Sequence, residues 1–430
     1  MSPIRLHLFA YQVGFGDCFL LRFVYPDDST RHVLIDFGTV GMPDGVDKAK
    51  QMLRIANDIK DKCAGKLDVL VATHRHADHI SGFDPLKKGN GPGSIIRALN
   101  PDVVLQPWTE QPDLAEDATA PLAAAHVQAL AGMNEVARQL KARMDSKPKG
   151  LDAALERRLG FLGENNISNK GAVNNLIAMG SRPGARAVYA HFGSDDPLAE
   201  VLPGIRTRVL GPPTVEQSAE VRRERRTDPE YWLRAPLLFA PQGTATASAS
   251  PFPDAPCARG SKLPQNARWI AGRVRRARGD QWLSIVTALD KAMNNTSLIL
   301  LFEAGGKKLL FPGDAQIENW RYALNQPEIA ALLTSVDLYK VGHHGSLNAT
   351  PKSLWKGFSN KDESKRPGRL TSVLSTLPEQ YGDKNAGDGT EVPRVPLLNA
   401  LDKDSDLHDT HRLPPGVLYD EVVLELQETP

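Results

Sequence analysis

The chain has 430 residues with 52 Lys and Arg against 51 Asp and Glu, a formal net charge of +1. The length predicts one large domain with insertions or two domains, and the balanced charge gives no global electrostatic reason to bind nucleic acid or an anionic membrane. Three well-separated cysteines predict neither a disulfide framework nor a thiolate zinc site, and no uncharged apolar run approaches the roughly 18 residues of a membrane span. We therefore expect a soluble, cytoplasmic protein without a membrane partner.

The first 112 residues contain short apolar runs and turns typical of the strand-rich half of a domain. Three strands separated by Gly and Asp turns are expected at residues 4–14, 18–25 and 31–38. Residues 47–63 then place apolar side chains at helical spacing, and residues 67–73 (LDVLVAT) are predicted to form a buried strand.

The middle of the chain has a different composition. Residues 113–240 contain Ala- and Leu-rich stretches with helical periodicity, such as 121–144 and 151–162. Residues 241–262 are small, polar and Pro-rich, which is typical of a mobile linker. We predict an inserted helical cap over 113–240 and a flexible linker over 241–262.

Strands return in residues 263–430, which we assign to the second half of the domain begun in residues 1–112. The expected strands lie at 281–289, 296–306, 307–314, 336–346, 371–376 and 416–428. Two strand-rich regions around a helical one predict an α/β fold in which two sheets pack together with helices outside.

The densest group of chemically active residues lies in VLVATHRHADHISGF, residues 69–83. His74 and His76 are two apart on an extended segment, so both imidazoles can face one ion. Asp78 and His79 are adjacent and diverge, so the four side chains suit two neighbouring ions better than one tetrahedral site. A histidine-rich loop or a single structural ion is the alternative, but three of the 11 histidines within six residues favour metal ligands.

Three further candidates follow apolar strands in the second half. Asp314 ends the run LLFPGD, and His343 and His344 follow LYKVG. Polar ligands can converge at strand ends without interrupting a core, although an ordinary Gly-Asp turn is the alternative for Asp314. Gly342 releases the strand before the two histidines, so they should face different directions, one as a metal ligand and the other as a neighbouring acid or cap.

The pattern HxHxDH, from His74 to His79, resembles the signature of the metallo-β-lactamase superfamily. The resemblance implies a metallo-β-lactamase αββα four-layer sandwich, here with the helical cap inserted, that holds one or two metals between its sheets. It also implies that Asp314 bridges the metals and that a histidine at a later strand end completes the site. In the superfamily the metal-bound imidazole directly precedes a glycine, which favours His344 as the ligand and leaves His343 facing the substrate.

A narrower similarity is carried by residues 13–23, 34–38, 294–302, 309–314 and 339–346. These segments look like the hydrolase domain of the ComEC-type DNA-uptake proteins and their soluble relatives, over residues 5–105 and 280–380. ComEC usually has aspartate where this chain has His76, so the more nitrogen-rich site favours Zn²⁺, with Mn²⁺ as the other candidate. The chain has no transmembrane channel, so the resemblance does not imply DNA uptake.

The remaining site residues are less directly indicated. Many superfamily members have a third histidine where this chain has Asn294 and Asn295, whose amides can coordinate weakly or orient a ligand. His191 is the other candidate for that place. Asp36 and Asp17 lie at strand ends, where each either hydrogen-bonds a ligating imidazole or shapes a turn.

Together these features predict a binuclear metal-dependent hydrolase in which a hydroxide bridging two divalent ions attacks the substrate. Asp78 would take the proton of the water and His343 would protonate the leaving group. A phosphodiester of a nucleic acid or nucleotide is favoured, because the resemblance points to nucleic-acid degradation and arginine-rich runs lie at 222–226 and 273–278. The alternatives are an ester, thioester, lactone or lactam substrate, or a non-catalytic binding protein on the same fold.

Overall fold

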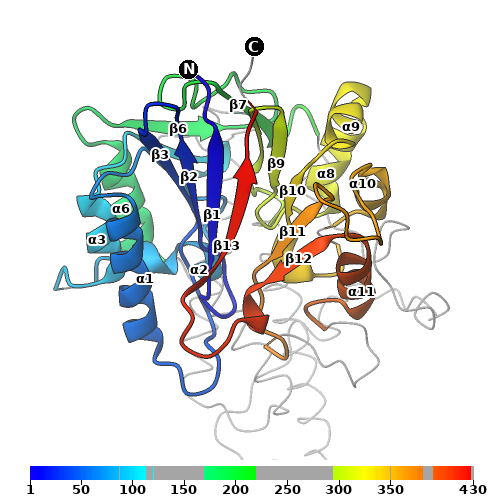
Figure 1. The fold of residues 1–430 in the computed structure, drawn as a ribbon. Helices are drawn as coiled ribbons and strands as arrows, with labels where there is room; N and C mark the ends of the chain where they lie inside the picture. Colours follow the sequence, from blue (N-terminus) through cyan, green and yellow to red (C-terminus); the bar gives the residue numbers. More distant parts are fainter. Residues whose placement is uncertain are drawn as a thin grey trace, which may run out of the picture.

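The computed structural model describes residues 1–86, 88–112, 120, 169–218, 294–348, 350–380 and 391–427. They form a mixed α/β fold with two mixed β-sheets and helices outside them (Figure 1). The predicted α/β class is thereby confirmed. Within these ranges, no helix has both the length and the apolar character needed to cross a bilayer.

The first sheet has the strand order β13-β1-β2-β3-β4-β5-β6. Strands β13, β1, β2 and β3 pair antiparallel, and β3, β4, β5 and β6 pair parallel. Its edge strand β13 lies beside β1, with Arg5 opposite Glu425. The bounds are β1 Arg5–Tyr11, β2 Phe19–Val24, β3 Thr30–Ile35, β4 Val69–Val71, β5 Val103–Pro107, β6 Arg186–Ala190 and β13 Tyr419–Glu425.

The second sheet has the order β12-β11-β10-β9-β8-β7 and repeats the same succession. Strands β7, β8 and β9 pair antiparallel, and β9, β10, β11 and β12 pair parallel. The bounds are β7 Ile205–Gly211, β8 Ile299–Ala304, β9 Lys307–Phe311, β10 Leu338–Lys340, β11 Thr371–Leu374 and β12 Asp406–Asp409. In both sheets, therefore, parallel strands follow an antiparallel group, and parallel strands bring their carboxyl ends to one edge.

The helices connect the strands and cover the outer faces of the sheets. The α-helices are α1 Lys48–Lys62, α2 Ala77–Ile80, α3 Pro92–Ala98, α6 Lys170–Gly180, α8 Ile317–Leu324, α9 Pro327–Leu333, α10 Lys352–Gly357 and α11 Val395–Asp404. Short 3₁₀ turns are η1 Ser81–Phe83, η2 Trp108–Glu110, η6 Gly342–Gly345 and η7 Thr410–Arg412. Helix α1 begins at Asp47, whose side chain accepts a hydrogen bond from the Lys50 amide, and it buries Ile55 and Ile59 four residues apart.

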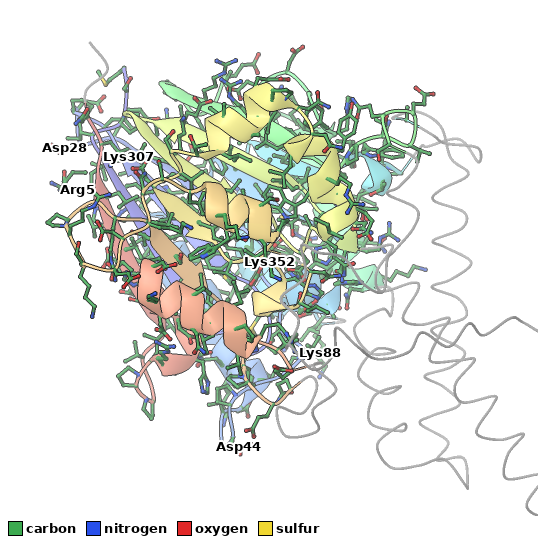
Figure 2. The ribbon with its side chains drawn as sticks, turned by 90° about the vertical axis from the view of Figure 1, so that its right-hand side faces the viewer. Arg5, Asp28, Asp44, Lys88, Lys307 and Lys352 are labelled. Atoms are coloured by element: carbon green, nitrogen blue, oxygen red, sulfur yellow. The ribbon has the colours of Figure 1, made fainter. Side chains whose placement is uncertain are left out.

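Three apolar clusters show how the helices and sheets are stacked. One lies between the sheets and joins residues such as Leu21 and Val71 of the first sheet to Leu300 and Phe311 of the second. Another packs α1, α3 and α6 on the outer face of the first sheet, and the third packs α8, α9, α10 and α11 on the outer face of the second. Figure 2 looks onto this last helical layer, with Lys352 of α10 near its centre. The layers therefore succeed one another as helices, sheet, sheet and helices.

The range predicted for the helical cap, 113–240, is too wide. Residues 169–218 lie within it, yet they form α6, β6 and β7, and β6 and β7 are edge strands of the first and second sheets. Edge strands keep one side open to solvent, and β6 carries partly exposed residues along most of its length, so its pattern is not that of a buried strand. The remaining parts of the predicted cap and the linker 241–262 lie outside the described residues.

Candidate metal centre at the strand ends

The motif of residues 74–79 begins two residues beyond β4, and Thr73, just before it, is held to the neighbouring strand β3. The Thr73 amide and hydroxyl both donate hydrogen bonds to the Asp36 carboxylate, at 2.7 and 2.6 Å. Asp36 comes directly after β3, so this pair of bonds fixes the two strand ends against each other. Residue 76 then caps α2, which carries Asp78 and His79 in its single buried turn.

The second sheet contributes its own strand ends to the same place. Asp314 follows β9 after Gly313, which has a φ of 54°. A Cβ at Gly313 would lie 2.9 Å from the Thr73 Cβ, so only glycine allows the β9 turn to approach the end of β4 this closely. The Leu298 amide, just before β8, also donates a hydrogen bond to the Thr73 carbonyl at 3.0 Å. The two sheets therefore meet at Thr73.

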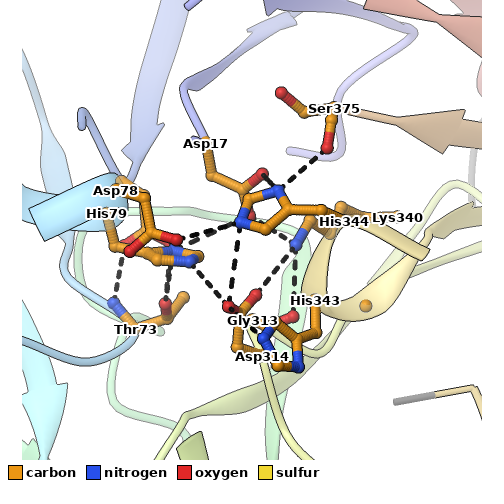
Figure 3. A network of polar contacts seen from close by, with 12 residues as sticks. Asp17, Thr73, Asp78, His79, Gly313, Asp314, Lys340, His343, His344 and Ser375 are labelled. Carbon is orange, nitrogen blue, oxygen red and sulfur yellow. Dashed lines mark hydrogen bonds and ion pairs between the residues drawn. The ribbon is translucent and has the colours of Figure 1, made fainter. Parts of the chain in front are cut away.

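Four side chains from both sheets form a cluster, which we call the metal cluster: Asp78, His79, Asp314 and His344. One potential ligand atom from each lies within 4.8 Å of the others, and all four side chains are buried. His79 Nε2 lies 3.0 Å from Asp314 Oδ2, and His344 Nε2 lies 3.1 Å from Asp78 Oδ2 (Figure 3). The structure thus brings together four of the six side chains predicted to bind metal.

The other two predicted ligands, His74 and His76, lie beside this cluster. His74 Nε2 is 2.9 Å from His76 Nδ1, and the His74 ring centroid is 4.2 Å from that of His79. Burial and the neighbouring imidazoles lower the pKa of His74 well below its usual value, which keeps it in the neutral form that binds metals. These two histidines lie next to the metal cluster, and neither belongs to the two His/Asp groups found among the described residues.

The rear nitrogens of two cluster histidines are occupied. His79 Nδ1 donates to Asp36 Oδ2 at 2.7 Å, and His344 Nδ1 donates to the Ser375 carbonyl at 2.9 Å. Both rings therefore turn Nε2 toward the cluster, the arrangement in which an outer hydrogen bond fixes the tautomer of a metal-binding histidine. Asp36 was predicted either to hydrogen-bond a ligating imidazole or to shape a turn, and in the structure it accepts the hydrogen bond from the His79 imidazole.

The charges of the cluster favour a bound cation. Burial by itself lowers the pKa of His79, but Asp314, Asp36 and Asp78 outweigh it and raise that pKa well above its usual value. Burial by itself raises the pKa of Asp314, yet His79, His343 and His344 bring it well below its usual range. In the absence of a metal, protons on the histidines balance the buried carboxylates, and a divalent ion would replace them.

The donor atoms present fit divalent metals. Among the described residues, the buried Asp78 Oδ1 has no hydrogen-bond partner, and neither does the buried side-chain amide of Asn294. Buried polar atoms are otherwise paired in folded proteins, so an unpaired carboxylate oxygen on a residue of the metal cluster indicates a missing ion or ligand. Imidazole nitrogens with carboxylates suit Zn²⁺ and also accept Mn²⁺.

The two consecutive histidines have different environments. His344 is fully buried in the metal cluster, whereas His343 keeps 22% of its side chain exposed. His343 Nε2 lies 3.8 Å from Asp314 Oδ2, and its Nδ1 is 2.9 Å from the Ser346 hydroxyl. His343 therefore lies at the rim of the cluster with a polar neighbour that orients its ring.

The weaker candidates fall in different places. The Asn295 amide nitrogen is 3.5 Å from Glu318 Oε2, and Asn294 is fully buried. His191 lies directly after β6, half-buried, with Nδ1 2.9 Å from the Phe192 carbonyl, and it belongs to neither His/Asp group of the described residues. The arginine runs at 222–226 and 273–278 lie outside the described residues.

One buried residue of the site was not singled out from the sequence. Lys340, the last residue of β10, is 1% exposed and forms an ion pair with Asp17 Oδ2. The only signal was a lysine inside an otherwise apolar strand, and a single charge does not reveal its partners. Asp17 thus reaches the site, but its nearest polar partner is this ammonium.

No family model matches the chain, and no curated protein matches it either.

Proposed function

We propose that this chain is a metal-dependent hydrolase of the metallo-β-lactamase superfamily, similar to the ComEC-type hydrolase domains, with an αββα sandwich as its fold. The observation that carries the proposal is the metal cluster, where ligand atoms from both sheets lie within 4.8 Å of one another in a buried site. The succession of helices, sheet, sheet and helices also supports it. A binding protein without catalysis has no need for such a set of unpaired buried donors.

Two divalent ions, with Zn²⁺ favoured, account for the donors present. Asp78, His79, Asp314 and His344 would hold one ion, while His74 and His76 would hold a second, with the Asn294 amide as a weak further donor. When bound, such ions lower the pKa of a coordinated water and polarise a phosphoryl or carbonyl oxygen.

The side chains around the cluster supply orientation and proton transfer. Asp78 has one oxygen facing His344 and the other unpaired among the described residues, so it can accept a proton from the attacking water. His343, held by the Ser346 hydroxyl and partly exposed, can donate a proton to the leaving group. The buried Phe15 ring packs against the His344 ring, with 4.4 Å between the ring centroids.

A phosphodiester of a nucleic acid or nucleotide is the proposed substrate class. The support is the similarity of five sequence segments to a branch linked to nucleic-acid degradation, together with the two arginine-rich runs. An ester, thioester, lactone or lactam would use the same metal chemistry.

The test is a substrate panel given to the metal-loaded protein: bis-p-nitrophenyl phosphate, single-stranded DNA, duplex DNA, RNA and small esters. We expect phosphodiesters to be cleaved faster than esters, and turnover to be lost in Asp78→Ala, His74→Ala, His76→Ala and Asp314→Ala. Turnover of carbonyl substrates alone would assign the second substrate class. Unchanged rates in all four variants would show that the metal cluster is not the active site.

A further inference from the structure

The described residues contain two groups of His and Asp side chains that are close enough to hold a cation, and both include His79. The first is the metal cluster. The second, which we call the carboxylate cluster, consists of Asp17, Asp36 and His79. By ligand count alone, each group is a candidate for a divalent ion.

Lys340 places an ammonium group against the carboxylate cluster. Its Nζ forms an ion pair with Asp17 Oδ2, donates a hydrogen bond to the Gly313 carbonyl at 3.1 Å and lies 3.7 Å from Asp314 Oδ1 (Figure 3). Asp17 and the Gly313 carbonyl are thus close partners of the ammonium, while Asp314 Oδ1 lies at ion-pair distance only. Lys340 is 1% exposed, so the positive charge of this ion pair lies in the interior beside Asp17.

We propose that Lys340 is a positioning residue whose ammonium serves as the cation of the carboxylate cluster, excludes a divalent ion from it and so confines metal to the metal cluster. His79 faces both clusters. Its Nδ1 lies 2.7 Å from Asp36 in the carboxylate cluster, and its Nε2 lies 3.0 Å from Asp314 in the metal cluster. The same ammonium lies nearer to Asp314 Oδ1, which leaves Oδ2 directed at the histidines. This inference rests on the proposed metal site.

Removal of the ammonium would leave the buried Asp17 carboxylate, next to Asp36 in the carboxylate cluster, without its ion-pair partner. A buried charge without a counter-ion is strongly unfavourable, so the carboxylate cluster would then recruit a cation from solution. Truncation of Lys340 to alanine also leaves room for that cation.

The experiment compares the number of ions bound by the wild-type chain and by Lys340→Ala, after equilibrium dialysis against Mn²⁺ or Zn²⁺ and elemental analysis. We expect the variant to bind about one more ion per chain than the wild type, because two carboxylates and an imidazole are ligand types that suit Mn²⁺ and Zn²⁺. An unchanged number of ions in folded Lys340→Ala would overturn the proposal.

A second variant keeps the test informative if Lys340→Ala does not fold. The double variant Asp17→Asn with Lys340→Met removes both charges of the ion pair, so it should fold and bind the wild-type number of ions. Loss of an ion from this double variant would show that Lys340 acts on the metal cluster itself, which contradicts the proposal. Gain of an ion by the double variant would also contradict the proposal.

Lys62→Ala is the matched control, since Lys62 is also a largely buried lysine paired with an aspartate, Asp58, but outside both clusters. Its ion count should equal that of the wild type. If the wild-type chain binds no metal, the proposed function fails together with this inference. If the wild type binds metal and Lys340→Ala binds the same number, only this inference fails.

Discussion

His343 and His344 share an unusual backbone that separates their side chains. Both have positive φ angles, 43° and 51°, in a region that residues other than glycine seldom adopt. Such a conformation costs on the order of 1–3 kcal/mol per residue and persists where surrounding contacts enforce it, often at functional sites. Here the turn sends His344 into the metal cluster, toward Asp78, and leaves His343 at its rim.

Alanine at these two positions should therefore have different effects. His344→Ala should lose bound metal, because Nε2 of that ring lies inside the cluster. His343→Ala should keep its metal and lose turnover by about 100-fold, the loss typical of a missing general acid. Elemental analysis combined with hydrolysis of bis-p-nitrophenyl phosphate separates the two results, and retained metal in His344→Ala with loss in His343→Ala would reverse the roles.

Asp36 should influence metal binding without touching the ion. Its carboxylate accepts the Nδ1 proton of His79, so Asp36→Asn would loosen the orientation and lower the basicity of that ring. We expect metal affinity to fall by about 10- to 100-fold, as for other outer hydrogen-bond partners of ligating histidines. Competition with a chelating dye measures this, with His191→Ala as the control that keeps wild-type affinity. Equal affinities of Asp36→Asn and the wild type would contradict the role.

At the scale of elements, a contact between the edge strands β12 and β13 joins the two sheets. His408 Nδ1 on β12 lies 2.8 Å from Asp420 Oδ2 on β13, so the pair connects the edge strand of the second sheet to that of the first. The hydrogen bond to Asp420 raises the pKa of His408, and the same bond lowers the pKa of Asp420.

This pair should stabilise the fold in a limited pH range. The stabilisation that results from the raised pKa of His408 is fully present below about pH 6.5 and is lost as the pH rises through the folded-state pKa. The stabilisation that results from the lowered pKa of Asp420 is present above about pH 4 and is lost as the pH falls through the folded-state pKa. His408→Gln should therefore reduce the free energy of unfolding by about 0.5 kcal/mol more at pH 5.5 than at pH 8.5, a small effect because both side chains are 26% exposed. Urea unfolding at the two pH values tests it, and equal losses would rule the interaction out.

The elements also show which parts of the site could be predicted from sequence. His74 to His79 lie within one short motif after a strand, so local spacing was enough to propose them as ligands. The contact of Asp17 with Lys340 joins distant segments through the pairing of two sheets, and no periodicity in one sequence specifies such a contact. Strand β6 cannot be predicted from its sequence, because it lacks the continuous apolar pattern of β4 and β8, whereas residues 207–213 (TRVLGPP) resemble a strand of the family and overlap β7.

At the scale of the whole molecule, the metal cluster links the two sheets, with Asp78 and His79 from the first and Asp314 and His344 from the second. Metal bound only by the folded chain should stabilise it by about 2.7 kcal/mol when the free metal is about 100-fold above its dissociation constant. Treatment with a chelator should therefore lower the melting temperature, and added metal should restore it. The chelator should lower the melting temperature of His79→Ala by less than it lowers that of the wild type, because this variant lacks one ligand of the metal cluster. A wild-type protein that melts alike in both conditions would contradict a metal between the sheets.

The pairing of β1 with β13 has a consequence for the time at which the protein becomes complete. On the β13 side of β1, the strand partner of Arg5 is Glu425, which comes 420 residues later. At about 5–20 residues per second, a ribosome needs roughly 20 to 80 seconds to make the intervening chain. During that interval β1 lacks its neighbour β13. The histidines of residues 74–79 are made before Asp314 and His344, so the metal cluster is incomplete until those two residues are synthesised. Metal acquisition at the full site is therefore a late event in the life of each newly made chain.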